Sequence, residues 1–88
     1  MLLSMNHREA QRILACGMDR LRDERERQGL TLQKFGQISG VSRTMIARIE
    51  RGERSPTLIV CLRVADALGL QLVDVLKDVP AKKDGRRR

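Results

Sequence analysis

Three side chains between positions 42 and 51 could together contact the edges of DNA bases: Arg43, Thr44 and Arg48. An arginine fork matches the O6 and N7 acceptors of guanine, and the major groove of DNA admits an α-helix. With 3.6 residues per turn, Thr44 lies about one turn before Arg48, and Arg43 lies beside Thr44. A helix over residues 42–51 would therefore present all three residues on one surface that faces the groove.

Further polar and basic residues in the same region could hold phosphate groups and so position a duplex. They are Gln33, Lys34, Ser42, Arg51 and Arg54. The overall charge agrees with this assignment, because 18 Lys and Arg against 11 Asp and Glu give the 88 residues a net charge of +7. A balance this basic in so small a chain favours a polyanionic partner.

The residues that catalysis or metal binding would need are scarce. His7 is the single histidine, and the two cysteines, Cys16 and Cys61, are far apart in the sequence. They supply neither the roughly four ligands of a zinc site nor a catalytic triad. We expect Cys61 to be a small core residue and Cys16 to be half-buried on a helix. No glycine-rich phosphate loop occurs, so we expect neither an enzyme nor a metal or cofactor.

The length is that of one domain, and no stretch approaches the ~20 apolar residues of a membrane span. The opening residues 1–5 are too short for a secretory apolar region. We therefore expect a cytoplasmic protein that is associated with the nucleoid when bound to DNA. Three segments are expected: an N-terminal helical extension (1–17), a DNA-binding domain (18–76) and a disordered basic tail (77–88) with six basic and two acidic residues.

Apolar residues at helical spacing predict an all-α domain. Asn6 followed by Glu9 matches a capping box, which begins a helical pattern that ends at Gly29. Gly17 interrupts this pattern, so residues 7–28 fit either one helix or two.

Short helices follow, with Thr31 and Ser42 as the N-caps of the second and third, and Thr57 or Ser55 as the N-cap of the fourth. The expected core positions in these helices and in the intervening turn are Leu32, Phe35, Ile38, Val41, Ile46, Ile49, Leu58, Cys61, Leu62, Ala65 and Leu68. Residues 70–76 fit either a helical turn or a strand.

Two short helices separated by Gly40 in a turn are a candidate helix-turn-helix unit. Gly36 is a small residue at the point where the second helix of such a unit presses closely on the first. The segments GVSRTMIARIERGERSP and ADALGL resemble the phage-repressor and Cro-type (xenobiotic-response-element type) helix-turn-helix family, and the resemblance covers roughly residues 18–76. It implies a five-helix, repressor-like domain that binds operator DNA as a dimer through its third helix.

The resemblance also implies an ion pair between Arg25 and Glu50, since Glu50 lies on the inward side of the third helix, where an unpaired carboxylate would be costly. Two positions depart from the family pattern. Gly36 stands where the family prefers alanine, which should cost about 0.8–1.0 kcal/mol of helix propensity. Leu32 replaces a polar residue that many relatives use to hold a phosphate, which leaves Gln33 and Lys34 as substitutes.

The fourth helix carries β-branched apolar residues, Ile59 and Val60, at positions that its pattern leaves outward. We expect a homodimer that buries them together with Leu72.

The function that we expect is that of a sequence-specific, DNA-binding transcriptional regulator. One alternative is an antitoxin that binds a toxin protein and regulates its own operon. The segment ALGLQLVDVLKD resembles the segment that some antitoxins form into a dimerising strand. A strand at residues 70–76 would therefore favour this alternative. Another is an interaction module, which burial of Arg43 and Arg48 in salt bridges would favour.

Overall fold

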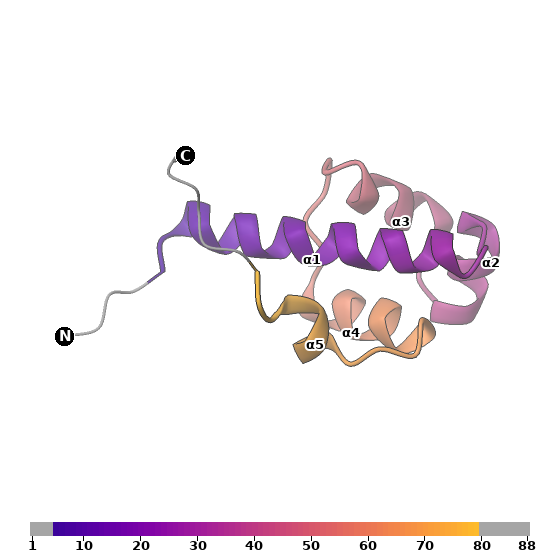
Figure 1. Cartoon of the computed structure of the whole chain (residues 1–88). Coiled ribbons are helices and arrows are strands. Elements are labelled where there is room, and N and C mark those ends of the chain that lie inside the picture. The colour runs from indigo at the N-terminus through magenta and orange to yellow at the C-terminus, as the bar shows by residue number, and fades with distance from the viewer. Residues whose placement is uncertain (1–4, 80–88) are drawn as a thin grey trace.

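Helices make up the regular structure of residues 5–79, the part of the chain that the computed structural model describes (Figure 1). They are α1 (His7–Arg27), α2 (Leu32–Ser39), α3 (Arg43–Glu50), α4 (Leu58–Ala67) and α5 (Leu72–Leu76). The expected all-α fold of five helices is confirmed, and residues 5–79 contain no strand. Because residues 72–76 form α5, the strand alternative for residues 70–76 is wrong.

α1 is a single helix of 21 residues, which decides between the two interpretations of residues 7–28. The side-chain oxygen of Asn6 accepts a hydrogen bond from the N–H of Glu9 at 2.8 Å and begins the helix. Gly17 lies within this helix and is buried against α5, where a Cβ atom would lie 2.5 Å from Cδ2 of Leu76. The boundary expected between residues 17 and 18 therefore falls inside a continuous helix.

The next three helices begin at side-chain caps. The hydroxyls of Thr31, Ser42 and Thr57 accept hydrogen bonds from the backbone N–H three residues later, at 3.0, 3.1 and 3.2 Å. Each bond satisfies one of the amide groups left free at a helix start. Thr57, and not Ser55, is thus the N-cap of α4.

Glycines follow the ends of four helices, and all of them have positive φ: Gly29, Gly40, Gly52 and Gly69. After α1, α3 and α4, the residue that follows the glycine donates its N–H to the carbonyl oxygen five residues earlier, at 2.9–3.1 Å. This is the Schellman arrangement, which satisfies carbonyl groups at a helix end.

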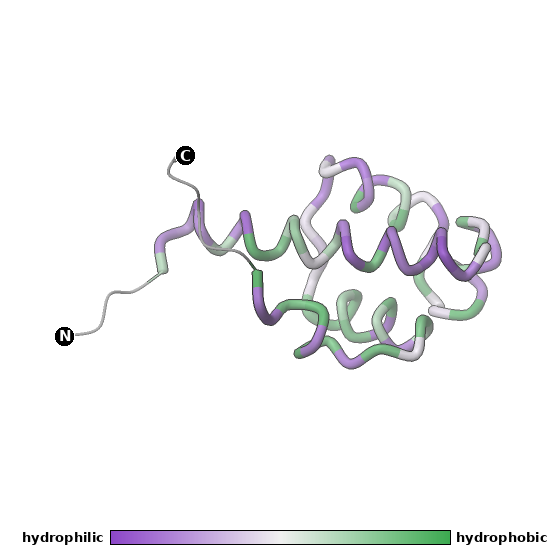
Figure 2. The backbone as a smooth tube through the Cα atoms, viewed as in Figure 1, coloured by the Kyte–Doolittle hydropathy of each residue, from purple (hydrophilic) through white to green (hydrophobic). Residues whose placement is uncertain are grey.

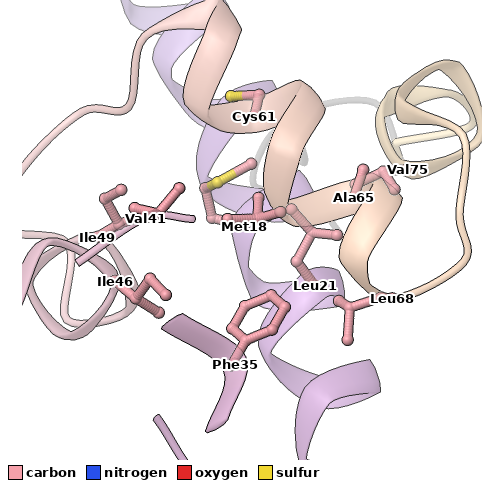
Figure 3. Close-up of a cluster of buried hydrophobic side chains, with 11 residues drawn as sticks. Met18, Leu21, Phe35, Val41, Ile46, Ile49, Cys61, Ala65, Leu68 and Val75 are labelled. Atoms are coloured by element: carbon pink, nitrogen blue, oxygen red, sulfur yellow. The ribbon is translucent and has the colours of Figure 1, made fainter. Parts of the chain in front are cut away.

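The core joins all five helices (Figure 3). Its buried apolar side chains are Met18, Leu21, Phe35, Val41, Ile46, Ile49, Cys61, Val64, Ala65, Leu68 and Val75. α1 contacts both α3 and α5, and α2 contacts both α3 and α4. Figure 1 shows α1 as the long helix that runs past the other four. Cys61 is in the core and Cys16 is half-buried, which confirms the expectation for both thiols.

One expected core residue of α2 lies on the surface. Ile38 is 49% exposed, whereas the neighbouring Ser39 is buried. Ser39 lies four residues after the buried Phe35 and so shares its side of the helix. Its hydroxyl accepts a hydrogen bond from the N–H of Val41 at 3.2 Å, so the polar group is satisfied where the chain turns into α3.

The expected core face of α4 is also partly wrong, because Leu58 and Leu62 are 67% and 50% exposed. The buried stripe consists of Cys61, Val64 and Ala65 in α4 and continues to Leu68. Leu62 lies about 100° around the helix from Cys61, outside that stripe, and Leu58 lies in the first turn. Figure 2 shows that α4 and α5 are nevertheless largely hydrophobic along their length.

The segment that follows α5 is held against α1 by Arg20. Its Nη1 donates hydrogen bonds to the carbonyl oxygens of Val75 at 2.9 Å and Lys77 at 2.6 Å, and Nη2 donates to that of Asp78 at 3.1 Å. Residues 77–79, which were expected to belong to the disordered tail, therefore pack as part of the folded domain. The rest of the basic tail expected over 77–88, namely 80–88, lies outside the described residues, as do residues 1–4 of the expected extension.

Candidate nucleic-acid interface

α2, the turn of residues 40–42 and α3 form a helix-turn-helix unit in which the two helices pack together. A Cβ atom on Gly36 would lie 2.9 Å from the carbonyl oxygen of Val41 and 3.4 Å from the backbone nitrogen of Arg43. The missing side chain thus allows α2 to lie directly against the backbone at the start of α3. This close approach is the physical reason for glycine at a position where it lowers helix propensity.

The outer face of α3 carries the three residues expected to contact bases. Arg43, Thr44 and Arg48 are exposed, while Ile46 and Ile49 on the opposite face are buried. Within residues 5–79 neither Arg43 nor Arg48 forms an ion pair. The condition that would have favoured an interaction module, burial of these arginines in salt bridges, is therefore not met.

Several residues expected to contact phosphate surround the starts of α2 and α3. Gln33, Lys34 and Ser42 are exposed there. Gln33 and Ser42 line a shallow depression that Arg43 and Gln37 also line, so the structure brings expected backbone and base contacts together. Gln37 was not among the residues expected from the sequence, although its position one turn after Gln33 on an exposed helix face was a usable signal.

Arg51 and Arg54 are placed differently from each other. Arg51 is the C-cap of α3, and it continues the stripe of Thr44 and Arg48 because the three follow at intervals of four and three residues. Arg54 is exposed but lines a cavity between α1 and the loop after α3, together with Asp19. The structure therefore brings Arg51, but not Arg54, into line with the outer face of α3.

An acidic residue that was not expected at this site, Glu53, contacts Arg51. Nε and Nη2 of Arg51 donate to the two carboxylate oxygens of Glu53 at 2.9 and 3.0 Å. The hydrogen bonds from Arg51, followed by the charges of Arg51 and Arg48, hold the pKa of Glu53 below its ordinary value. The same hydrogen bonds raise the pKa of Arg51.

An ion pair between Arg25 and Glu50 lies on the side of α3 opposite its exposed face. Nε and Nη2 of Arg25 donate to the carboxylate of Glu50 at 2.7 and 2.9 Å, and Nη1 donates to the carbonyl oxygen of Leu30 at 2.6 Å. Both charged side chains are only 11% exposed. The hydrogen bonds to Glu50 raise the pKa of Arg25, against the opposing effect of burial. This pair fixes the end of α3 to the last turn of α1 and so orients the exposed face of α3.

Neither a metal site nor a membrane-spanning helix occurs in residues 5–79. Residues 5–79 contain no group of three His, Cys, Asp or Glu side chains placed to hold a metal ion. Among the helices described here, none combines the length and the apolar character that crossing a membrane requires.

The arrangement is that of a helix-turn-helix DNA-binding protein. Residues 21–75 match the model of the family HTH_3, described as helix-turn-helix. The chain therefore belongs to the HTH_3 family, which confirms the resemblance to Cro-type proteins.

Similar proteins carry the names of transcriptional regulators. The chain is 38% identical over 65 residues to an HTH-type transcriptional regulatory protein of Pyrococcus abyssi, covering 74% of this chain and 21% of that protein. It is 30% identical over 79 residues to the HTH-type transcriptional regulator y4dJ of Sinorhizobium fredii, covering 90% of this chain and 99% of that protein.

A solved structure agrees with these relatives. The restriction-modification controller protein C.AhdI from Aeromonas hydrophila superposes with a TM-score of 0.64 at 30% identity, covering 72% of this chain and 94% of that chain. The chain thus belongs to a helix-turn-helix family in which similar proteins carry the names of transcriptional regulators, and it spans 21% of the length of the Pyrococcus abyssi relative.

Proposed function

We propose that the protein regulates transcription by binding operator DNA sequence-specifically, with α3 in the major groove. The observation that carries this proposal is the outward placement of Arg43, Thr44 and Arg48 on a helix whose opposite face is buried. A side chain that contacts a base edge must be free to leave its own domain, and these arginines form no ion pair within residues 5–79. A bidentate contact from arginine to guanine would then supply sequence preference.

Sequence-independent affinity would come from the surrounding residues. Gln33, Lys34, Ser42, Arg51 and Arg54 would contact the phosphate backbone and set the orientation of α3 in the groove. Gln37 extends this set, because it lines the same depression as Gln33.

We further propose that the protein acts as a homodimer through α4 and α5, which contact each other. Large apolar side chains lie exposed on these two helices: Leu58, Ile59, Leu62 and Val73. Val60 and Leu72 pack partly against the core of their own domain, so the centre of the interface would shift from Val60 towards Leu58 and Leu62. A two-fold dimer would present two α3 helices to half-sites about 34–36 Å apart.

The partners proposed are accordingly double-stranded operator DNA and a second copy of the chain, in the cytoplasm. A strand at residues 70–76 would have favoured the antitoxin alternative, but these residues contain α5 instead. Nothing observed in residues 5–79 favours a toxin partner.

Selection of bound duplexes from a random pool tests the proposal, carried out at two salt concentrations. We expect one enriched motif with two-fold symmetry at both concentrations, because base contacts remain when salt weakens phosphate contacts. Retention of DNA at low salt only, with no enriched sequence, would contradict sequence-specific binding.

A further inference from the structure

Glu53 is an acidic residue at the end of the exposed row of α3 side chains that includes Arg48 and Arg51. Between positions 42 and 54 the other acidic residue is Glu50, which lies behind α3 in its ion pair with Arg25. Glu53 instead is exposed beside the end of the row formed by Thr44, Arg48 and Arg51.

The backbone fixes the place of Glu53 relative to this row. Gly52 adopts φ +74°, which a residue with a side chain rarely adopts. This conformation turns the chain so that the N–H of Glu53 donates to the carbonyl oxygen of Arg48 at 2.9 Å. Glu53 is therefore held next to the last turn of α3 by the helix end itself.

The side chain of Glu53 occupies the atoms of Arg51 that a phosphate would use. Nε and Nη2 of Arg51 donate to its two oxygens at 2.9 and 3.0 Å. Carboxylate and phosphate both accept this paired arrangement of N–H groups from a guanidinium. The two side chains are 57% and 54% exposed, so the pair adds little to the stability of the fold.

We propose that Glu53 competes with the DNA backbone for Arg51 and thereby lowers the affinity of the protein for DNA of every sequence. The inference rests on the proposed function, because it assigns Arg51 to a phosphate. Arg51 would leave Glu53 when a phosphate arrives, and the broken pair would subtract from the affinity gained. Since phosphate contacts are independent of sequence, the competition reduces the occupancy of non-specific DNA as much as that of the operator.

The test compares the dissociation constants of wild type and Glu53→Gln for a selected duplex and for a scrambled one at low salt. We expect Glu53→Gln to bind both duplexes about 2- to 5-fold more tightly than wild type, which corresponds to the strength of an exposed ion pair. In an Arg51→Ala background the same Glu53→Gln change should have no effect. The melting temperature should stay unchanged, which separates competition from a structural role.

Glu26→Gln is the matched control, because it adds the same charge by breaking an exposed ion pair, with Arg22, on α1. An equal gain from Glu26→Gln would reduce the effect to net charge and overturn the proposal. Unchanged or weaker binding by Glu53→Gln, or a gain that persists without Arg51, would also overturn it. If the wild type bound neither duplex, the proposed function itself would fail instead.

Discussion

Arg25 in the last turn of α1 and Glu50 at the end of α3 form a two-pronged ion pair with bonds of 2.7 and 2.9 Å. The third arm of the guanidinium binds the carbonyl oxygen of Leu30, just after the turn that ends α1. One side chain thus joins the end of α1, the approach to α2 and the end of α3. The pair sets the orientation of the helix that we propose enters the major groove.

Removing the carboxylate of this pair should strongly lower the free energy of unfolding. Glu50→Ala leaves a largely buried guanidinium without its partner, and such a loss typically costs about 3–5 kcal/mol. Small domains have a total unfolding free energy of about 5–15 kcal/mol, so the expected loss is a large share of it. Urea unfolding followed by circular dichroism measures this change.

Glu26→Gln is the control for Glu50→Ala, since Glu26 lies 3.8 Å from the same guanidinium but is 53% exposed. Its free energy of unfolding should stay within about 1 kcal/mol of wild type. A Glu50→Ala protein that melts within a few degrees of wild type would show that the pair does not hold α3.

Alanine at two helical glycines should have opposite effects. At Gly17 the new Cβ would meet Cδ2 of Leu76, the far end of a flexible side chain, at 2.5 Å. We expect Leu76 to move and the helix propensity of alanine to add up to about 1 kcal/mol to stability. At Gly36 the new Cβ would meet the backbone oxygen of Val41 at 2.9 Å. Because the backbone cannot move aside as a side chain can, Gly36→Ala should lower stability despite the same gain in helix propensity.

Thermal unfolding of the two variants side by side measures these changes. A stabilised Gly36→Ala protein would mean that α2 can withdraw from the start of α3 without loss. The close approach of α2 to Val41 would then not be the reason that this chain has glycine where the family prefers alanine.

The two thiols should react at very different rates. Burial raises the pKa of Cys61, which lowers the thiolate fraction that attacks an alkylating reagent. Cys16 is half-buried and should be labelled more than about tenfold faster than Cys61 in the folded protein. Mass spectrometry of proteolytic fragments after timed labelling gives both rates, and in urea the two should become similar. Equal rates without urea would show that α4 opens readily.

A charge at the exposed face of α4 should abolish the proposed dimer without unfolding the domain. Ile59 is 66% exposed, so Ile59→Glu removes little from the core of one copy but places two carboxylates in a symmetric interface. Sedimentation at micromolar concentration should show a dimer for wild type and a 10.0 kDa monomer for Ile59→Glu. Ile38→Glu, an exposed apolar position on α2, should remain dimeric. A wild type that sediments as the monomer with and without DNA would exclude the dimer.

Features that depend on a few neighbouring residues could be predicted from the sequence. The hydroxyl caps of Thr31 and Ser42, and the stop at Gly40, each follow from local backbone chemistry. The continuity of α1 through Gly17 could not be predicted, because a glycine inside a helical pattern fits either one helix or two, and its neighbour Leu76 is close in space but far away in the chain.

The same distinction holds for the candidate site. The spacing of Thr44 and Arg48 along a helix places them on one face, and this required only the helical period. The pairing of Arg51 with Glu53 depends on the turn at Gly52, whose geometry the residue pattern did not reveal. Ile38 and Leu62 were misplaced for a related reason, since helical spacing alone does not define the edges of the buried stripe.

The most direct test of sequence reading by α3 is the affinity of Arg43→Ala and Arg48→Ala for selected and scrambled duplexes at several salt concentrations. We expect each variant to lose about 1–3 kcal/mol of binding free energy on the selected duplex and much less on the scrambled one. Each variant should also lose its sequence preference at one base pair. Lys34→Ala, at an exposed position near the start of α2, is the comparison, because loss of a phosphate contact should weaken both duplexes alike and reduce the salt slope by about one unit. Equal losses on both duplexes for Arg43→Ala and Arg48→Ala would contradict the assignment of α3 as the helix that reads sequence.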